Sequence, residues 1–104
     1  MKELVSGHKY ELANFENKEF PGQILQFIHK EPSTEDNTVL ITVSDGTTNE
    51  EVIEALIARI SYLQGKFPCK ENACSITHLE EALMWLEKRT KDRLKRNVEG
   101  KHLK

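Results

Sequence analysis

The first half of the chain alternates short apolar runs with polar turns, a pattern typical of β-strands. Runs at residues 10–15, 23–30 and 39–43 contain many aromatic and β-branched residues, which strands favour. Pro21 and Gly22 predict a type II turn between the first two runs. The polar stretch 31–37 predicts a loop before the third run. The pattern therefore predicts a small antiparallel β-sheet of about three strands over residues 8–44.

The second half of the chain changes to helical spacing. Residues 48–51, Thr-Asn-Glu-Glu, form a capping box that predicts a helix starting after Thr48. Gly65 is expected to act as the C-cap of this helix, and Pro68 prevents its continuation. Its apolar face is formed by Val52, Ile53, Leu56, Ile57, Ile60 and Leu63. A second helix is expected from near residues 70–72 to about residue 96, with an inner face formed by Ile76, Leu79, Leu83, Leu86 and Thr90.

Together these elements predict an α+β fold in a single domain, residues 1–104. The β-sheet part covers about residues 8–44 and an antiparallel two-helix hairpin about residues 48–96. Residues 97–104 are expected to form a mobile tail. A domain of this size buries only about 60–70% of its potential surface, and the predicted sheet has apolar residues on both sides. We therefore expect a partner chain to cover one side.

The net charge of −2 conceals an uneven distribution. Residues 87–104 hold eight basic and three acidic side chains, whereas residues 1–86 hold seven basic and fourteen acidic ones. Because duplex DNA is bound mainly through phosphate neutralisation along its length, an acidic body with one basic end argues against duplex DNA as the partner. It suits a small anion held at one place.

Several other classes of protein are disfavoured by the sequence. No apolar run approaches the roughly 20 residues that span a membrane, and no signal-peptide core is present, so a cytoplasmic location is expected. Cys69 and Cys74 are expected to be buried free thiols. Together with His78 they form a Cys-x4-Cys-x3-His series that matches no standard zinc module. Neither a metal nor a cofactor is expected.

The sequence also contains no recognisable catalytic motif. It has no glycine-rich phosphate loop, no Gly-x-Ser-x-Gly and no His-Glu-x-x-His. Glu80 and Glu81 are neighbours on the predicted helix and point about 100° apart, so they cannot act on one bond. A binding protein is therefore expected, not an enzyme.

Two groups of residues are not explained by the predicted core. Tyr62 lies about 150° from the centre of its helix's apolar face, so it is either an ordinary surface residue or a ring for stacking. A second line of residues follows the later helix: His78, Ala82, Trp85, Arg89, Arg93 and Arg96. The tryptophan can simply pack, and cations near a helix C-terminus complement its dipole. Arginine, however, is the residue that forks onto phosphate.

Five short segments occur together in this chain: Asp-Gly-Thr-Thr-Asn-Glu-Glu-Val at 45–52, Glu-Asn at 71–72, Leu-Glu-Glu-Ala-Leu-Met-Trp-Leu at 79–86, Arg-Thr-x-x-Arg at 89–93 and Val-Glu-Gly at 98–100. Over roughly residues 20–102 the chain resembles the phage Thoeris anti-defence type 1 family. The resemblance implies a β-sheet followed by a two-helix hairpin, assembled as a homo-oligomer, a hexamer of paired dimers.

The resemblance also implies a function in the cytoplasm of an infected bacterial host. Pockets between protomers would sequester a cyclic nucleotide, glycocyclic ADP-ribose, the signal of a host TIR-domain defence, without hydrolysing it. A separate site for the cyclic di- or trinucleotides of CBASS defence is a further implication. Two other functions stay open: an adaptor that binds RNA or a protein through the basic helix end, and a small nucleotide hydrolase.

Four residues match the family's pocket positions. The resemblance implies that Tyr62 is the pocket aromatic, Asn72 the pocket amide, and Arg89 and Arg93 the anion-binding arginines. Asn72 has an alternative role as the N-cap of the second helix. Further ligand contacts are expected from His78, Trp85 and Arg96.

Overall fold

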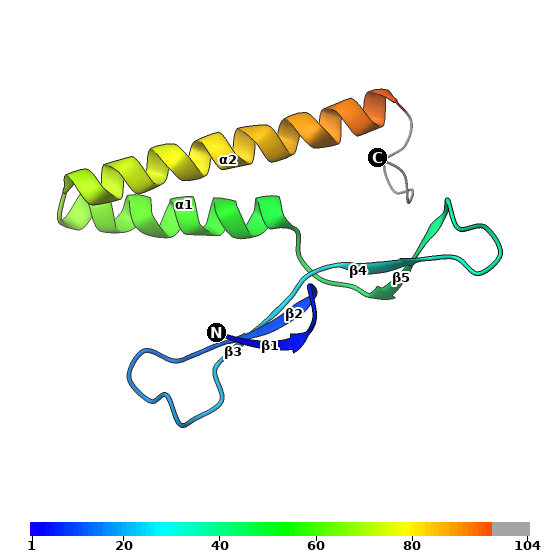
Figure 1. Ribbon diagram of the computed structural model, residues 1–104. Coiled ribbons are helices and arrows are strands. Elements are labelled where there is room, and N and C mark those ends of the chain that lie inside the picture. Colours follow the sequence, from blue (N-terminus) through cyan, green and yellow to red (C-terminus); the bar gives the residue numbers. More distant parts are fainter. Residues whose placement is uncertain (97–104) are drawn as a thin grey trace. The chain divides into compact units, whose positions relative to one another are not determined.

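The computed structural model describes residues 1–96, which form five strands followed by two helices (Figure 1). The chain divides into two compact units, Met1–Thr48 with all the strands and Asn49–Lys104 with both helices. This is the α+β arrangement predicted, and the boundary lies where the apolar pattern changes from strand to helix. The predicted tail, 97–104, lies outside the described residues.

The strands form two antiparallel sheets. β1 (Lys2–Val5), β2 (Lys9–Leu12) and β3 (Gln23–Gln26) pair in that order, and β4 (His29–Pro32) pairs with β5 (Leu40–Ser44). The prediction of a single sheet of about three strands was therefore too simple. All four residues of β1 are exposed. This strand is held by its pairing with β2, and no alternation of buried and exposed residues indicates it in the sequence.

The apolar run 23–30, predicted as one strand, is divided between the two sheets. The division occurs at Phe27 and Ile28, where successive amides bond to different partners. The Phe27 amide donates to the His8 carbonyl at 2.8 Å, and the Ile28 amide donates to the Thr47 carbonyl at 2.8 Å. Phe27 also meets Tyr10 edge to face, with ring centroids 6.0 Å apart. The chain therefore changes partners within one apolar run.

The type II turn predicted around Pro21 and Gly22 is not formed. Such a turn requires a positive φ at its third residue, and Gly22 does not have one; among the described glycines only Gly7 does. Gly22 is required for a different reason, since a Cβ there would collide with the carbonyl oxygen of Leu12 on the neighbouring strand. The loop predicted at 31–37 also begins later, because β4 extends to Pro32.

α1 (Asn49–Lys66) and α2 (Lys70–Lys95) pack side by side as an antiparallel hairpin (Figure 1). α1 begins directly after Thr48, as the capping sequence predicted. Gly65 lies inside α1 and is not its C-cap. The N-cap of α2 is Cys69, whose sulfur accepts a hydrogen bond from the Asn72 amide at 3.4 Å. The N-cap role considered for Asn72 is therefore wrong.

The helical hairpin has a thin core. Partial burial is confirmed for the predicted inner residues of α2: Ile76, Leu79, Leu83, Leu86 and Thr90. On α1, by contrast, Leu56 is 45% exposed and Leu63 is 36% exposed. Across residues 1–96 no apolar side chain is fully buried. So much apolar exposure is unusual for an isolated chain.

Both cysteines are free, as predicted, but they are exposed and not buried. Cys69 lies in the bend between the helices, where it caps α2. Cys74 is two residues before Ile76, so it points about 200° away from that partly buried position. Neither described helix is long and apolar enough to cross a lipid bilayer.

Candidate functional site

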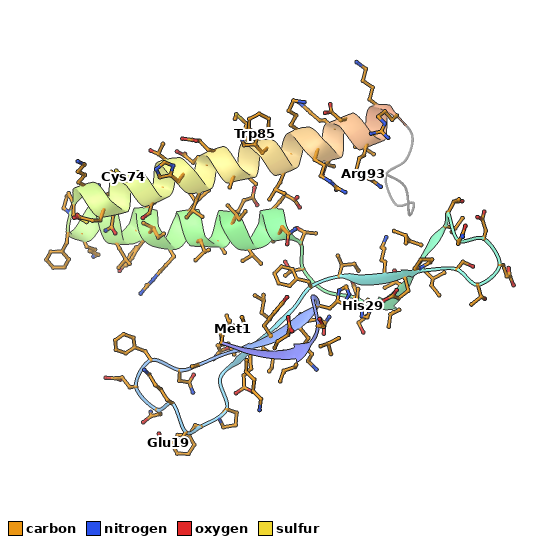
Figure 2. All side chains as sticks on the ribbon, in the orientation of Figure 1. Met1, Glu19, His29, Cys74, Trp85 and Arg93 are labelled. Carbon is orange, nitrogen blue, oxygen red and sulfur yellow. The ribbon has the colours of Figure 1, made fainter. Side chains whose placement is uncertain are left out.

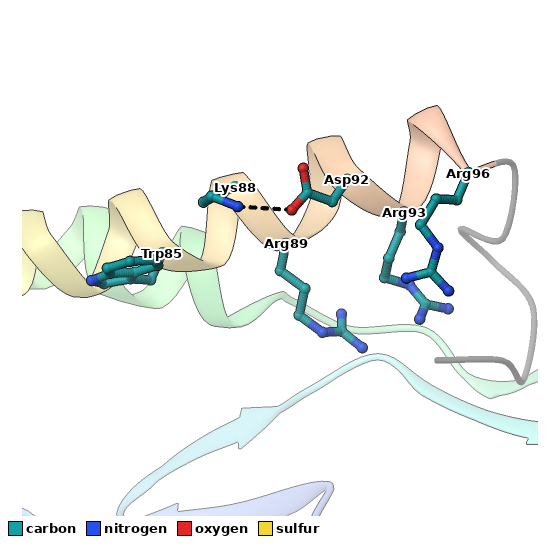
Figure 3. A pocket seen from close by; sticks show the side chains of 6 residues that line it. All are labelled: Trp85, Lys88, Arg89, Asp92, Arg93 and Arg96. Carbon is teal, nitrogen blue, oxygen red and sulfur yellow. Dashed lines mark hydrogen bonds and ion pairs between the residues drawn. The ribbon is translucent and has the colours of Figure 1, made fainter.

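A basic groove follows the C-terminal half of α2. It encloses about 390 Å³ and is lined by Trp85, Lys88, Arg89, Asp92, Arg93 and Arg96 (Figure 3). These residues recur at three- and four-residue steps, so one helix suffices to place their side chains along one side. The structure therefore brings together Trp85, Arg89, Arg93 and Arg96 as the spacing predicted.

The groove carries a net positive charge, with four basic side chains and one acidic side chain in its lining. Lys88 and Asp92 pair with each other, with Nζ and Oδ2 2.9 Å apart. Figure 3 shows the three arginine side chains on the same side of α2. The negative end of the helix dipole favours cations in these last turns, and guanidinium groups bind phosphate oxygens in a bidentate manner. This end of the helix is thus suited to bind an anion.

Trp85 lines the groove (Figure 3), and its side chain projects from the side of α2 that faces away from α1 (Figure 2). It is 62% exposed, which does not fit the alternative that it simply packs beside the core. An exposed indole next to cations can stack on a nucleobase while the cations hold its phosphates. The groove therefore combines two chemistries that nucleotides require.

Arg93 differs from the other arginines because it is buried, with only 6% of its surface exposed. It continues the partly buried series Leu86 and Thr90 at helical spacing. The burial of Arg93 could have been predicted from the sequence by extending the inner face of the helix by one turn. Arg93 therefore lines the groove from a buried position, whereas Arg89 and Arg96 are exposed.

Two residues in the groove were not predicted as part of it. The line of residues predicted along this helix contains neither Lys88 nor Asp92. Both are exposed, with side chains 60% and 54% accessible. Their ion pair spans one helical turn, the spacing at which a lysine and an aspartate meet, and that spacing could have revealed it.

His78 is not in the groove. It is seven residues before Trp85, a distance of about 10 Å along the helix. Its side chain is 77% exposed, and Nδ1 lies 3.9 Å from Oε1 of Glu81. The structure therefore places His78 outside the groove that Trp85, Arg89, Arg93 and Arg96 line.

Tyr62 and Asn72 lie at the opposite end of the hairpin. Tyr62 is 59% exposed, and Asn72 is partly buried in the first turn of α2. Arg89 follows Asn72 by 17 residues on the same helix, which corresponds to about 26 Å. Within one chain, the two predicted halves of the ligand site are therefore far apart.

The family follows from comparison with known proteins. Residues 23–91 match the family described as "Acb2/Tad1, hairpin domain", a stretch that includes β3, β4, β5, α1 and most of α2. The chain belongs to the Acb2/Tad1 hairpin family. The family assignment confirms the resemblance drawn from the sequence. Of the candidate residues, Arg93 and Arg96 lie beyond the end of the Acb2/Tad1 match.

The chain is also similar to a protein named Thoeris anti-defense 1, from Bacillus phage SBSphiJ7. The two are 53% identical over 62 residues, which make up 59% of this chain and 44% of that relative. The matched part thus covers less than half the length of the relative.

Proposed function

We propose that this protein captures a cyclic nucleotide signal of antiviral defence, glycocyclic ADP-ribose, and holds it without chemical change. The observation that carries the proposal is the groove of three arginines beside an exposed tryptophan. A cyclic ADP-ribose has two phosphates for the arginines and an adenine for an aromatic ring. The anti-Thoeris name of the similar phage protein supports the same ligand class.

The complete pocket is proposed to form between two chains. Tyr62 and Asn72 are separated from Arg89 by about 26 Å of helix, which a cyclic ADP-ribose does not span. Antiparallel apposition of two hairpins would bring Tyr62 and Asn72 of one copy close to the arginines of the other. The exposed apolar side chains of both units supply surface for such an assembly. A homo-oligomer, and a hexamer in particular, is therefore part of the proposal.

Within such a pocket each residue has a distinct role. The arginines would bind the phosphates, Tyr62 would stack on the base, and Trp85 would make a further contact with the ligand beside the arginines. The Asn72 amide offers a donor and an acceptor, the pair that reads an adenine edge. Since the sequence contains no nucleophile–base motif, the bound signal is expected to leave unchanged.

The test is to titrate the full chain with glycocyclic ADP-ribose, linear ADP-ribose, a cyclic dinucleotide and a short RNA, using calorimetry. Saturable binding of the cyclic ADP-ribose, with weaker binding of the linear form, is the expected result. Ligand released by heat should then re-elute unchanged in chromatography. Preferential binding of RNA would support the adaptor function instead, and conversion of the ligand within minutes would establish a hydrolase. Tight binding of the cyclic dinucleotide would indicate a CBASS signal as a second ligand.

A further inference from the structure

Three side chains capable of binding a metal meet within the strand unit: His8, His29 and Glu31. One ligand atom from each lies within 4.8 Å of the others. The two imidazole rings stack, with centroids 3.6 Å apart and planes 9° apart. His29 Nε2 is 2.7 Å from Glu31 Oε1. No local motif predicts this cluster, because residues 8 and 29 are distant in the chain.

The position of His8 is set by its backbone. Gly7 adopts a φ of 77° in the turn between β1 and β2, and the His8 amide donates to the Val5 carbonyl at 3.0 Å. The His8 carbonyl accepts from the Phe27 amide at 2.8 Å and from Gln26 Nε2 at 3.3 Å. Three hydrogen bonds on one peptide segment therefore hold His8 against the start of β4.

The positions of His29 and Glu31 are set by β4. They are alternate residues of this strand, so they project from the same face. The pairing register with β5 shifts between His29 and Lys30, and such irregularities re-aim side chains. His29 is only 15% exposed, whereas Glu31 is 54% exposed. The cluster thus has a sheltered side and a side open to solvent.

We propose that His8, His29 and Glu31 bind a divalent transition-metal ion of the zinc class. Two imidazole nitrogens and one carboxylate oxygen suit such borderline ions, and three protein ligands leave a fourth tetrahedral position for water. With metal–nitrogen distances of about 2.0–2.1 Å, the two nitrogens must come to about 3.3 Å from each other. A metal ion lies in the plane of each imidazole that binds it, and two stacked rings share no such plane. Metal binding therefore requires at least one of the two imidazoles to rotate out of the stack.

The site is independent of the nucleotide groove, because its residues belong to the strand unit and the groove belongs to α2. The proposal of a metal site and the proposal of nucleotide binding can therefore be tested, and refuted, separately. The competing explanation is a purely structural contact, in which stacking and the His29–Glu31 hydrogen bond hold β4 to the β1–β2 turn. The two explanations differ in whether an added metal is bound.

The test is calorimetric titration of the full chain with Zn²⁺, in a background where Cys69→Ser and Cys74→Ser remove the exposed thiols. One ion per chain is expected. Removing a residue that only hydrogen-bonds to a metal ligand lowers metal affinity by about 10–100-fold. His8→Ala and His29→Ala remove a ligand itself, so each should lower the affinity for Zn²⁺ at least about tenfold. Co²⁺ should give visible absorption bands of a low-symmetry site, and these bands should disappear in both variants.

Two further variants keep the test decisive if a histidine variant unfolds. Glu31→Gln retains the size of the side chain and a hydrogen-bonding group toward His29, so it should fold normally and yet bind Zn²⁺ at least tenfold more weakly. His78→Ala is the matched control, since His78 also lies near a glutamate but on the helical unit, and its affinity should equal that of the parent. The proposal is wrong if Zn²⁺ does not bind, if Glu31→Gln binds it unchanged, or if His78→Ala loses it.

Discussion

Lys66 places its ammonium nitrogen 5.4 Å from the centre of the Tyr62 ring, one helical turn away at the end of α1. A cation over an exposed aromatic ring contributes roughly 0.5–1 kcal/mol, enough to bias the ring toward one orientation. The tyrosine remains 59% exposed in this arrangement. The contact thus orients an accessible ring beside the bend of the hairpin, with a positive charge next to it.

Tyr62→Ala should weaken the binding of the cyclic nucleotide strongly, and Tyr62→Phe only slightly. Stacking of a base on an aromatic ring is worth about 1–3 kcal/mol. The alanine variant should therefore bind with an affinity lower by roughly 5- to 150-fold. Calorimetry with glycocyclic ADP-ribose measures the change. Equal affinities of Tyr62→Ala and the parent would remove this ring from the pocket.

Asn72→Ser should lower affinity without lowering the melting temperature. Serine removes the side-chain amide, but the backbone amide at this position still donates to the Cys69 cap. The paired variant Cys69→Ala should do the reverse, because it removes the capping acceptor and leaves the amide side chain intact. Thermal melts and titrations of both variants separate the two effects. A lower melting temperature with unchanged affinity in Asn72→Ser would assign this residue to the fold alone.

Arg89→Ala should reduce affinity about ten- to hundredfold, since a charge-assisted bond to phosphate is worth roughly 1.5–3 kcal/mol. Arg89 is exposed, so the melting temperature should change little. Lys95→Ala is the control, because Lys95 is also an exposed cation of α2 but does not line the groove. If both variants bind equally well, the arginine serves only to complement the helix dipole.

Arg93→Ala should lower both affinity and stability, in contrast to Arg89→Ala. Arg93 is 6% exposed, and deleting a buried hydrogen-bonding group leaves its surroundings unsatisfied at a cost of about 1–3 kcal/mol. Urea denaturation of the ligand-free chain measures this cost. A free energy of unfolding equal to that of the parent would show that the buried guanidinium has no structural role.

The protein should be an oligomer at micromolar concentration. No apolar side chain within residues 1–96 is fully buried, and association is the simplest way to remove this surface from water. Light scattering should therefore give a particle of several times the chain mass of 12.0 kDa. A particle of one chain mass would leave Tyr62 and Arg89 without a shared pocket and would contradict the two-chain site.

The helical half and its groove could be predicted from the sequence because their determinants are local. Residues three and four apart on a helix lie on the same side whatever surrounds it. The spacing of Trp85, Arg89 and Arg96 was therefore sufficient to place these side chains together. Likewise, the alternation of apolar and polar residues changes at Thr48, and α1 begins at the next residue.

The arrangement of the strands could not be predicted from local sequence, because strand pairing joins residues that are distant in the chain. No local pattern indicates that Phe27 and Ile28 bond to His8 and Thr47, and this change of partners divides one apolar run between two sheets. The close approach of Leu12 to Gly22 and the meeting of His8 with His29 have the same origin. Local spacing determined which side chains share a helix face, and only long-range backbone pairing decided which strand residues meet.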